Sequence, residues 1–260
     1  MLAPLIFLGV AALAALYAPL PAQFPATRLL LLTAHPDDEC LFFAPTLLSL
    51  ANCDVYSLTL STGDANGLGH LRRRELQGSL DVLGVAPDRR WSVDHPHLQD
   101  NITQHWDSTL IADVVRPYIL QHNIDTILTF DDHGISGHPN HQSLPAAVRQ
   151  LIHSYNSSLS SPPQLFTLVS VPLAAKYIGI ISPLLTKVTR YFYSPSPVFV
   201  SGMREYWRAV QAMRQHKSQL VWFRYLNVLF SRYMWVNEWV MVLSSPGDSS
   251  KLVPQPPYSQ

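Results

Sequence analysis

The chain of 260 residues carries 18 basic and 18 acidic side chains, and it therefore has no formal net charge. This balance gives no support for nucleic-acid binding, which depends on a basic surface. Only 14% of the residues are charged, compared with about 25% in typical soluble domains. The 47% hydrophobic content suits a protein that contacts a bilayer, and two cysteines provide no disulfide framework.

The N-terminal segment is apolar and uncharged from Leu2 to Leu20, and the first charged residue is Arg28. A stretch of this length can just span a hydrocarbon core of about 30 Å. We expect residues 1–27 to form a transmembrane helix and a linker. A cleaved signal peptide is the alternative, but the basic residues that open such a peptide are missing. Positive residues after the segment favour a cytosolic body.

The apolar run Arg28–Thr33 predicts a buried strand, and the sequence His-Pro-Asp-Asp-Glu follows it from His35. Ligands bind at the carboxyl ends of strands in open α/β sheets. His35 and Asp38 can converge on one divalent metal, and Asp37 between them stays free to act on water. A capped turn before a helix is the alternative interpretation.

The next elements carry two further candidate residues. A strand is expected at Asp54–Leu60 and an amphipathic helix at His70–Gly84, followed by a short strand at Arg90–Val93. Three adjacent arginines begin at Arg72, and they represent either a solvated helix end or a site for a substrate phosphate. Asp100 lies in a polar loop after the short strand.

A second polar cluster follows the apolar run Thr126–Phe130, which predicts another strand. His138 and His141 lie shortly after this strand, so they are expected at the same sheet edge as His35. His141 can complete a His, Asp, His ligand set with His35 and Asp38, which leaves His138 to act on the substrate. A histidine-rich surface loop is the alternative.

The C-terminal half begins with a predicted helix at Gln142–Tyr155 and a strand at Leu165–Val171. The apolar stretch Leu173–Leu185 contains Lys176 and a proline, and we expect it to be interfacial or packed rather than a second span. Residues 220–239 mix aromatic residues with Arg224 and Arg232, a composition that fits either a core or a membrane-interface belt.

The motifs AHPDDE and SGHPNH, with the block LRRRELQGSLDVLGV, resemble the PIG-L/LmbE-like zinc de-N-acetylase family over residues 28–151. The resemblance implies a Rossmann-like α/β fold with an open, mostly parallel sheet flanked by helices. It implies Zn²⁺ as the cofactor, although the ligand set alone also accepts iron, cobalt or manganese. It assigns Asp37 as general base, His138 as a stabiliser of the oxyanion in its protonated form, and Arg72 and Asp100 as substrate-binding residues.

These expectations divide the chain into three parts. Residues 1–27 form the membrane anchor and linker. Residues 28–243 form the LmbE-like domain, whose C-terminal part is expected to associate with the membrane. Residues 244–260 are rich in Pro, Ser and Gln and are expected to be disordered.

The membrane features favour the branch of the family that acts on N-acetylglucosaminyl-phosphatidylinositol. The resemblance then implies removal of the acetyl group from this glycolipid, the second step in the synthesis of glycosylphosphatidylinositol anchors. It also implies an enzyme of the endoplasmic reticulum membrane that faces the cytosol. Two alternatives stay open: a de-N-acetylase of another small N-acetylglucosaminyl conjugate, and a catalytically inactive membrane scaffold.

Overall fold

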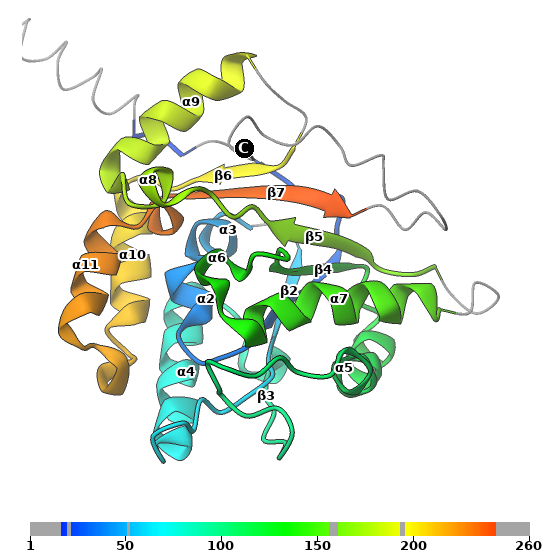
Figure 1. Cartoon of the computed structure of the whole chain (residues 1–260). Coiled ribbons are helices and arrows are strands. Elements are labelled where there is room, and N and C mark those ends of the chain that lie inside the picture. The colour runs from blue at the N-terminus through cyan, green and yellow to red at the C-terminus, as the bar shows by residue number, and fades with distance from the viewer. Residues whose placement is uncertain (1–16, 20–21, 51–52, 156–160, 193–195, 243–260) are drawn as a thin grey trace, which may run out of the picture.

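A computed structural model describes residues 17–19, 22–50, 53–155, 161–192 and 196–242 of the chain (Figure 1). Its centre is a seven-stranded sheet with the strand order β3-β2-β1-β4-β5-β7-β6. The strands are β1 (Arg28–Thr33), β2 (Asp54–Thr59), β3 (Arg90–Ser92), β4 (Thr126–Phe130), β5 (Gln164–Leu168), β6 (Val198–Val200) and β7 (Val236–Val242).

Strands β1 to β5 pair in parallel, whereas β7 runs antiparallel to both β5 and β6. The predicted α/β fold with an open, mostly parallel sheet is therefore confirmed. Central strands of such sheets are covered on both faces, and they read as continuous apolar runs rather than alternating ones. This is why Leu29–Leu32 in β1 and all five residues of β4 are buried.

Helices pack on both faces of the sheet (Figure 1). The group α3 (Ala44–Ser49), α4 (Gly69–Leu83) and α10 (Met203–Met213) lies together, and α5 (Ser108–His122) packs against α7 (Pro139–His153) as a separate pair. The shorter elements are α2 (Asp38–Leu41), η1 (Pro87–Arg89), α6 (Gly134–Gly137), α8 (Leu173–Lys176), η2 (Gly179–Ile181), α9 (Ser182–Phe192), η3 (Lys217–Gln219), α11 (Trp222–Phe230) and η4 (Arg232–Met234).

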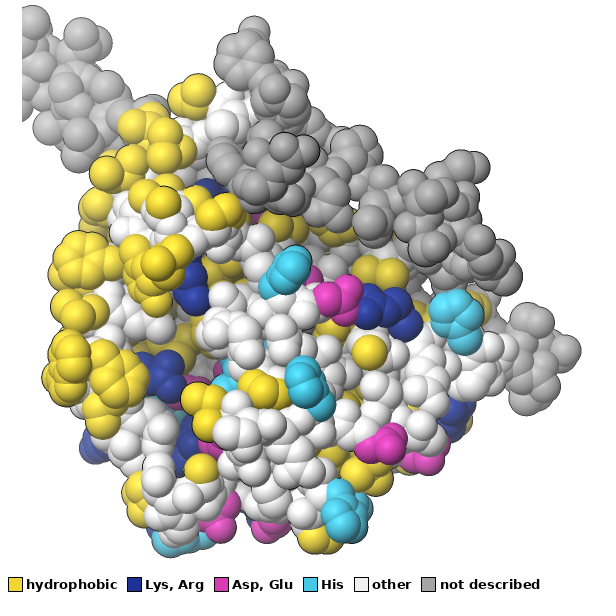
Figure 2. Space-filling model, viewed as in Figure 1, with side chains coloured by type: hydrophobic (Ala, Val, Ile, Leu, Met, Phe, Trp, Pro, Cys, Tyr) yellow, Lys and Arg dark blue, Asp and Glu magenta, His cyan; other side chains and the backbone are white. Residues whose placement is uncertain are grey.

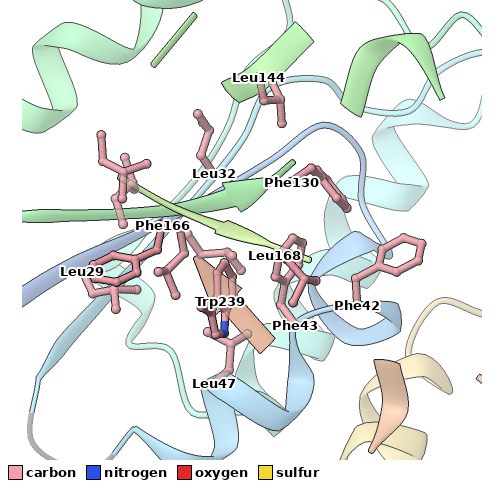
Figure 3. Close-up of a cluster of buried hydrophobic side chains, with 14 of the residues drawn as sticks. Leu29, Leu32, Phe42, Phe43, Leu47, Phe130, Leu144, Phe166, Leu168 and Trp239 are labelled. Carbon is pink, nitrogen blue, oxygen red and sulfur yellow. The ribbon is translucent and has the colours of Figure 1, made fainter. Parts of the chain in front are cut away.

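Aromatic side chains from distant parts of the chain fill the core beside the central strands (Figure 3). Phe43 stacks on Trp239 with ring centroids 5.8 Å apart, and its ring also meets the edge of Phe130. The indole Nε1 of Trp239 donates a hydrogen bond to Thr46 Oγ1 at 2.9 Å, so its polar atom is satisfied inside the core. These contacts fix the segment after β1 against the C-terminal strand β7.

The aromatic region at residues 220–239 divides into two parts. Trp235 and Trp239 are buried, as is Tyr233, so the interpretation of these residues as a membrane-interface belt is wrong. Tyr233 lies in η4, Trp239 lies in β7, and Trp235 lies between the two elements. Neither β7 nor its neighbour β6 was identified in the sequence. The first part forms α11, whose aromatic side chains are exposed.

Within the described ranges, no helix is both long and apolar enough to cross a membrane. Most of the expected N-terminal transmembrane helix (residues 1–16, 20 and 21) and the expected disordered tail lie outside the described residues.

Candidate active site

The turn after β1 places three side chains of the first motif at the carboxyl edge of the sheet. Asp38 Oδ2 accepts hydrogen bonds from the backbone amides of Ala34 and His35 at 3.1 and 2.9 Å. This turn points Asp38 Oδ1 toward His141, whose Nε2 lies 3.2 Å away. His35, Asp37 and Asp38 are all buried. The local sequence thus determines the turn, and the sheet brings it to the second motif.

The second motif reaches the same edge through α6 and the start of α7. His138 is the N-cap of α7, and its Nδ1 accepts a hydrogen bond from the Asn140 amide at 3.2 Å. One turn later, His141 stacks on Phe130 with ring centroids 4.0 Å apart. The nitrogens of His35, His138 and His141 lie within 4.8 Å of one another.

The hydrogen-bond partners define which ring nitrogens carry a proton. His35 Nε2 faces Asn140 Oδ1 at 3.0 Å and Asp100 Oδ1 at 3.4 Å, so it is the donor. His141 Nδ1 donates to the carbonyl of Gly134 at 3.1 Å. When both rings are neutral, the remaining atoms, His35 Nδ1 and His141 Nε2, present lone pairs to each other at 3.3 Å.

Two facing lone pairs with the Asp38 carboxylate beside them fit a divalent cation. Outer hydrogen bonds from ligating histidines to carbonyl and carboxylate oxygens are typical of metal sites, because they fix the tautomer and the ring orientation. Burial opposes ionisation of Asp38, but His141 and His35 hold its pKa well below the ordinary value. Asp38 is thus kept in the charged form that a metal requires.

Asp37 lies between two guanidinium groups. Its Oδ2 is 2.9 Å from Arg224 Nη2, and its Oδ1 is 3.8 Å from Arg72 Nη2. Burial raises the pKa of Asp37 above the ordinary carboxyl value, while Arg224 and Arg72 act in the opposite direction. Asp37 also has a φ of 105°, which is rare for a residue with a side chain. Strain of this kind is concentrated at functional sites.

Arg72 is buried, so it is not part of a solvated helix end. Its guanidinium donates to the carbonyls of Gly63 at 2.8 Å and Pro36 at 2.7 Å, and to Asp100 Oδ2 at 3.2 Å. A Cβ on Gly63 would lie 2.4 Å from the guanidinium carbon, so only glycine leaves room for this contact. Arg72 thereby connects the turn at Pro36 and the loop at Gly63 to Asp100.

His138 differs from the expectation of a protonated ring. Burial, together with the neighbouring His35 and His141, lowers its pKa to about 4. In the neutral ring Nδ1 accepts from Asn140, and Nε2 therefore carries the proton. That Nε2 lies 3.9 Å from Asp100 Oδ1 at the site. A neutral histidine in this tautomer still offers one hydrogen-bond donor.

Three residues at the site were missed in the sequence. Asn140 lies within the second motif and accepts from both His35 and the Asn101 amide. His216 donates to Glu39 at 2.7 Å in a fully buried pair, and Glu39 Oε2 accepts from the Asp37 amide at 3.0 Å. Arg224 had no local signal, because an arginine among aromatic residues also suits a membrane interface.

An α/β sheet that gathers imidazoles and carboxylates around a cation site at its strand ends is typical of metal-dependent hydrolases. Residues 30–152 match the PIG-L family, described as GlcNAc-PI de-N-acetylase. The N-acetylglucosaminyl-phosphatidylinositol de-N-acetylase of Bos taurus is 40% identical over 214 residues, 81% of this chain and 82% of that protein. A probable enzyme of the same name from Dictyostelium discoideum is 32% identical over 235 residues, 81% of this chain and 91% of that protein.

The chain therefore belongs to the PIG-L family, and it is a deacetylase. Its fold is similar to that of the N,N'-diacetylchitobiose deacetylase from Pyrococcus horikoshii, with a TM-score of 0.59. That likeness covers 84% of each chain at only 14% sequence identity, so it concerns the fold alone.

Proposed function

We propose that this protein hydrolyses the N-acetyl group of N-acetylglucosaminyl-phosphatidylinositol and releases acetate and glucosaminyl-phosphatidylinositol. The substrate in this proposal is the one named for relatives in the PIG-L family. The single observation that supports the chemistry is the buried Asp37 carboxylate beside the cluster of His35, Asp38 and His141.

The residues that would hold Zn²⁺ are His35, Asp38 and His141. The tautomers favour this set over one that includes His138, because the Nε2 of His138 carries a proton rather than a lone pair. The metal, when bound, supplies Lewis acidity that activates water and polarises the acetyl carbonyl. Other divalent metals also suit these ligands.

Asp37 acts as general base and takes the proton from the attacking water. The neutral His138 donates its Nε2–H to the oxyanion that develops on the acetyl carbonyl, a role that needs no added proton. Asp37 then delivers the proton to the glucosamine nitrogen as the C–N bond breaks. Burial raises the pKa of Asp37, and a raised pKa suits both the uptake and the return of the proton.

Arg72 and Asp100 form the substrate-binding side of the site. Asp100 is 17% exposed in its side chain and lies near both His35 and His138, so it can accept hydrogen bonds from sugar hydroxyls. Arg72 orients Asp100 through their 3.2 Å ion pair.

Membrane association is supported by an apolar face formed by η2, α9 and α11. In α9 the polar Ser182 and Thr186 are buried, whereas Leu184, Leu185 and Val188 are exposed. In a helix on a water-exposed surface, the polar side chains face the solvent and the apolar side chains are buried. Figure 2 shows hydrophobic side chains concentrated along this side of the molecule. The exposed members of the apolar face are Ile180, Ile181, Leu184, Leu185, Val188, Trp222, Phe223, Tyr225, Leu226, Leu229 and Phe230.

The described part of the N-terminal segment reaches the same face. Tyr17 Oη donates to the carbonyl of Ile180 at 3.3 Å, and Lys187 Nζ donates to the carbonyl of Ala18 at 2.6 Å. An N-terminal span that ends here and the apolar face can contact one bilayer. We place the protein in the endoplasmic reticulum membrane as a single-pass protein with its catalytic domain in the cytosol.

The acetate released from N-acetylglucosaminyl-phosphatidylinositol by detergent-solubilised protein tests the activity. We expect release to require metal and to fall by orders of magnitude in Asp37→Asn. Asp132→Asn is the matched control, because Asp132 is an exposed acid on the loop after β4. Activity confined to a soluble N-acetylglucosaminyl conjugate would indicate a different substrate, and full activity of Asp37→Asn would exclude the proposed mechanism.

The topology has its own test. Asn101-Ile102-Thr103 is a glycosylation sequon in an exposed loop. A cytosolic domain is expected to show no glycan at Asn101, and a shift in mobility that endoglycosidase reverses would place the domain in the lumen.

A further inference from the structure

Arg224 connects the apolar face to the catalytic site. It lies in α11, whose nine residues include no buried side chain, yet its Nη2 is 2.9 Å from Oδ2 of the buried Asp37. The two residues are 187 positions apart in the chain. The helix that presents Trp222 and Phe223 outward thus places a cation beside the proposed general base.

The two arginines around Asp37 differ in their freedom to bind substrate. The side chain of Arg72 is 6% exposed, and its guanidinium is already engaged with two backbone carbonyls and Asp100. An anion that approached Arg72 would have to displace these bonds. The side chain of Arg224 is 25% exposed, and Asp37 is its one ion-pair partner in the described part of the chain. An anion that approached Arg224 would have to displace this one ion pair.

The charge around Arg224 favours a phosphate. Residues 172–192 contain three basic residues and residues 217–230 contain two, and neither range contains an acidic residue. These are the segments that form the apolar face and its flanks. Figure 2 shows dark-blue basic side chains next to that face and a hollow beside them that contains magenta and cyan side chains. A lipid held in a bilayer against this face would present its phosphate to the basic edge of the hollow.

We propose that Arg224 recognises the phosphodiester of the lipid substrate, and that its guanidinium leaves Asp37 when this phosphate binds. This assignment rests on the proposed function and identifies the residue that selects a phospholipid over a phosphate-free sugar. Arginine suits the role because its planar guanidinium binds phosphate through two parallel hydrogen bonds.

The exchange follows from the ion pair of Arg224 with Asp37. A phosphate that approaches Arg224 competes with the Asp37 carboxylate for the guanidinium, whose Nη2 lies 2.9 Å from Asp37 Oδ2. The long arginine side chain can move between them while α11 stays docked. Arg224 also lies outside residues 30–152, the part that matches the family. Its location is consistent with a residue that sets substrate choice rather than the shared chemistry.

Steady-state kinetics on full-length, detergent-solubilised protein test the assignment. Two substrates are compared: N-acetylglucosaminyl-phosphatidylinositol and a soluble N-acetylglucosaminyl-inositol without phosphate. The quantity of interest is the ratio of their kcat/KM values. We expect Arg224→Gln to lower this ratio by about 10- to 100-fold, the range of a lost hydrogen bond to a charged group. Arg224→Lys should recover part of the lost ratio. Arg149→Gln removes one exposed charge from α7 and is the matched control.

An inhibition assay separates phosphate binding from a structural effect. Glycerophosphoinositol is expected to inhibit hydrolysis of the phosphate-free substrate by the unmodified protein, and to inhibit Arg224→Gln at least tenfold less. Inorganic phosphate should be the weaker inhibitor, since it lacks the inositol.

The outcomes distinguish this assignment from the proposed function. No hydrolysis of the phospholipid by the unmodified protein would overturn the proposed function itself. Hydrolysis with an unchanged ratio and unchanged inhibition in Arg224→Gln would overturn only the role of Arg224. An equal loss on both substrates would make Arg224 a positioning residue for Asp37, which also contradicts the assignment.

Discussion

His35 Nδ1 and His141 Nε2 lie 3.3 Å apart although 106 positions separate the two residues in the chain. Each ring donates its other N–H to a protein acceptor, so in the neutral rings the facing atoms both carry lone pairs. Their approach, with the Asp38 carboxylate 3.2 Å from His141, concentrates negative electrostatic potential in one buried place. A bound cation converts this unfavourable contact into coordination.

Metal binding should therefore stabilise the folded protein. With free zinc at 100 times its dissociation constant, the linkage relation gives about 2.7 kcal/mol, which corresponds to roughly 5–10 °C in Tm for a domain of this size. Thermal unfolding after chelation and after zinc is restored measures the shift. His141→Asn changes one of the metal ligands, so this variant should show little increase in Tm when zinc is added. Equal Tm values for the chelated and zinc-loaded protein would contradict the site.

Gly134→Ala should weaken metal binding without removing a ligand. A Cβ at Gly134 would lie 2.8 Å from Cβ of His141, and the residue has a φ of 58°. The imidazole would have to move away from the Gly134 carbonyl that orients it. We expect zinc affinity to fall about 10- to 100-fold, as for other losses of outer contacts. Calorimetric titration measures it.

Gly137→Ala is the matched control for that substitution. Gly137 has a φ of 74°, so alanine is strained there as well, but no atom lies within 4 Å of the added Cβ. If both variants bind zinc equally weakly, backbone strain rather than the displacement of His141 explains the result.

Asp37→Gly should abolish activity and raise stability relative to Asp37→Ala. Both variants remove the buried carboxylate, but only glycine adopts a φ of 105° without strain. Strain of this type costs on the order of 1–3 kcal/mol. Thermal unfolding of the two variants, with acetate release alongside, measures the difference. Asp37→Ala unfolding at the higher temperature would show that the backbone stores no strain.

The buried pair of Glu39 and His216 should be among the most sensitive positions for stability. Burial opposes ionisation of both, but each side chain favours the charged form of the other, so the pKa of Glu39 is lowered and that of His216 is raised. His216→Ala leaves a buried carboxylate without its counter-ion, which costs about 3–5 kcal/mol. Denaturant unfolding measures this cost.

The exposed pair of Arg149 and Asp132 provides the comparison. Arg149→Ala should cost less than about 1 kcal/mol, because solvent screens exposed ion pairs. Similar losses in the two variants would mean that burial does not strengthen the Glu39–His216 contact.

Much of the fold was predictable because its signals are local. β1 and β4 read directly as apolar runs, and the polar motifs after them had to share one sheet edge once the strands paired in parallel. The strands β6 and β7 were not predictable in this way. β6 is only three residues long, and β7 mixes apolar, aromatic and polar residues, so only the pairing of β7 with β5 and β6 distinguishes it from a membrane-interface belt.

By itself, the sequence determined the chemistry at the strand ends: a Pro turn carrying His35, Asp37 and Asp38, and a helix start carrying His138 and His141. Tertiary structure decided how these groups act. It buried Arg72 against two carbonyls, set the tautomers through Asn140 and Gly134, and brought Arg224 to Asp37 from 187 positions away. Short-range sequence signals specify turns and caps, whereas hydrogen-bond partners, burial and long-range ion pairs exist only after the chain has folded.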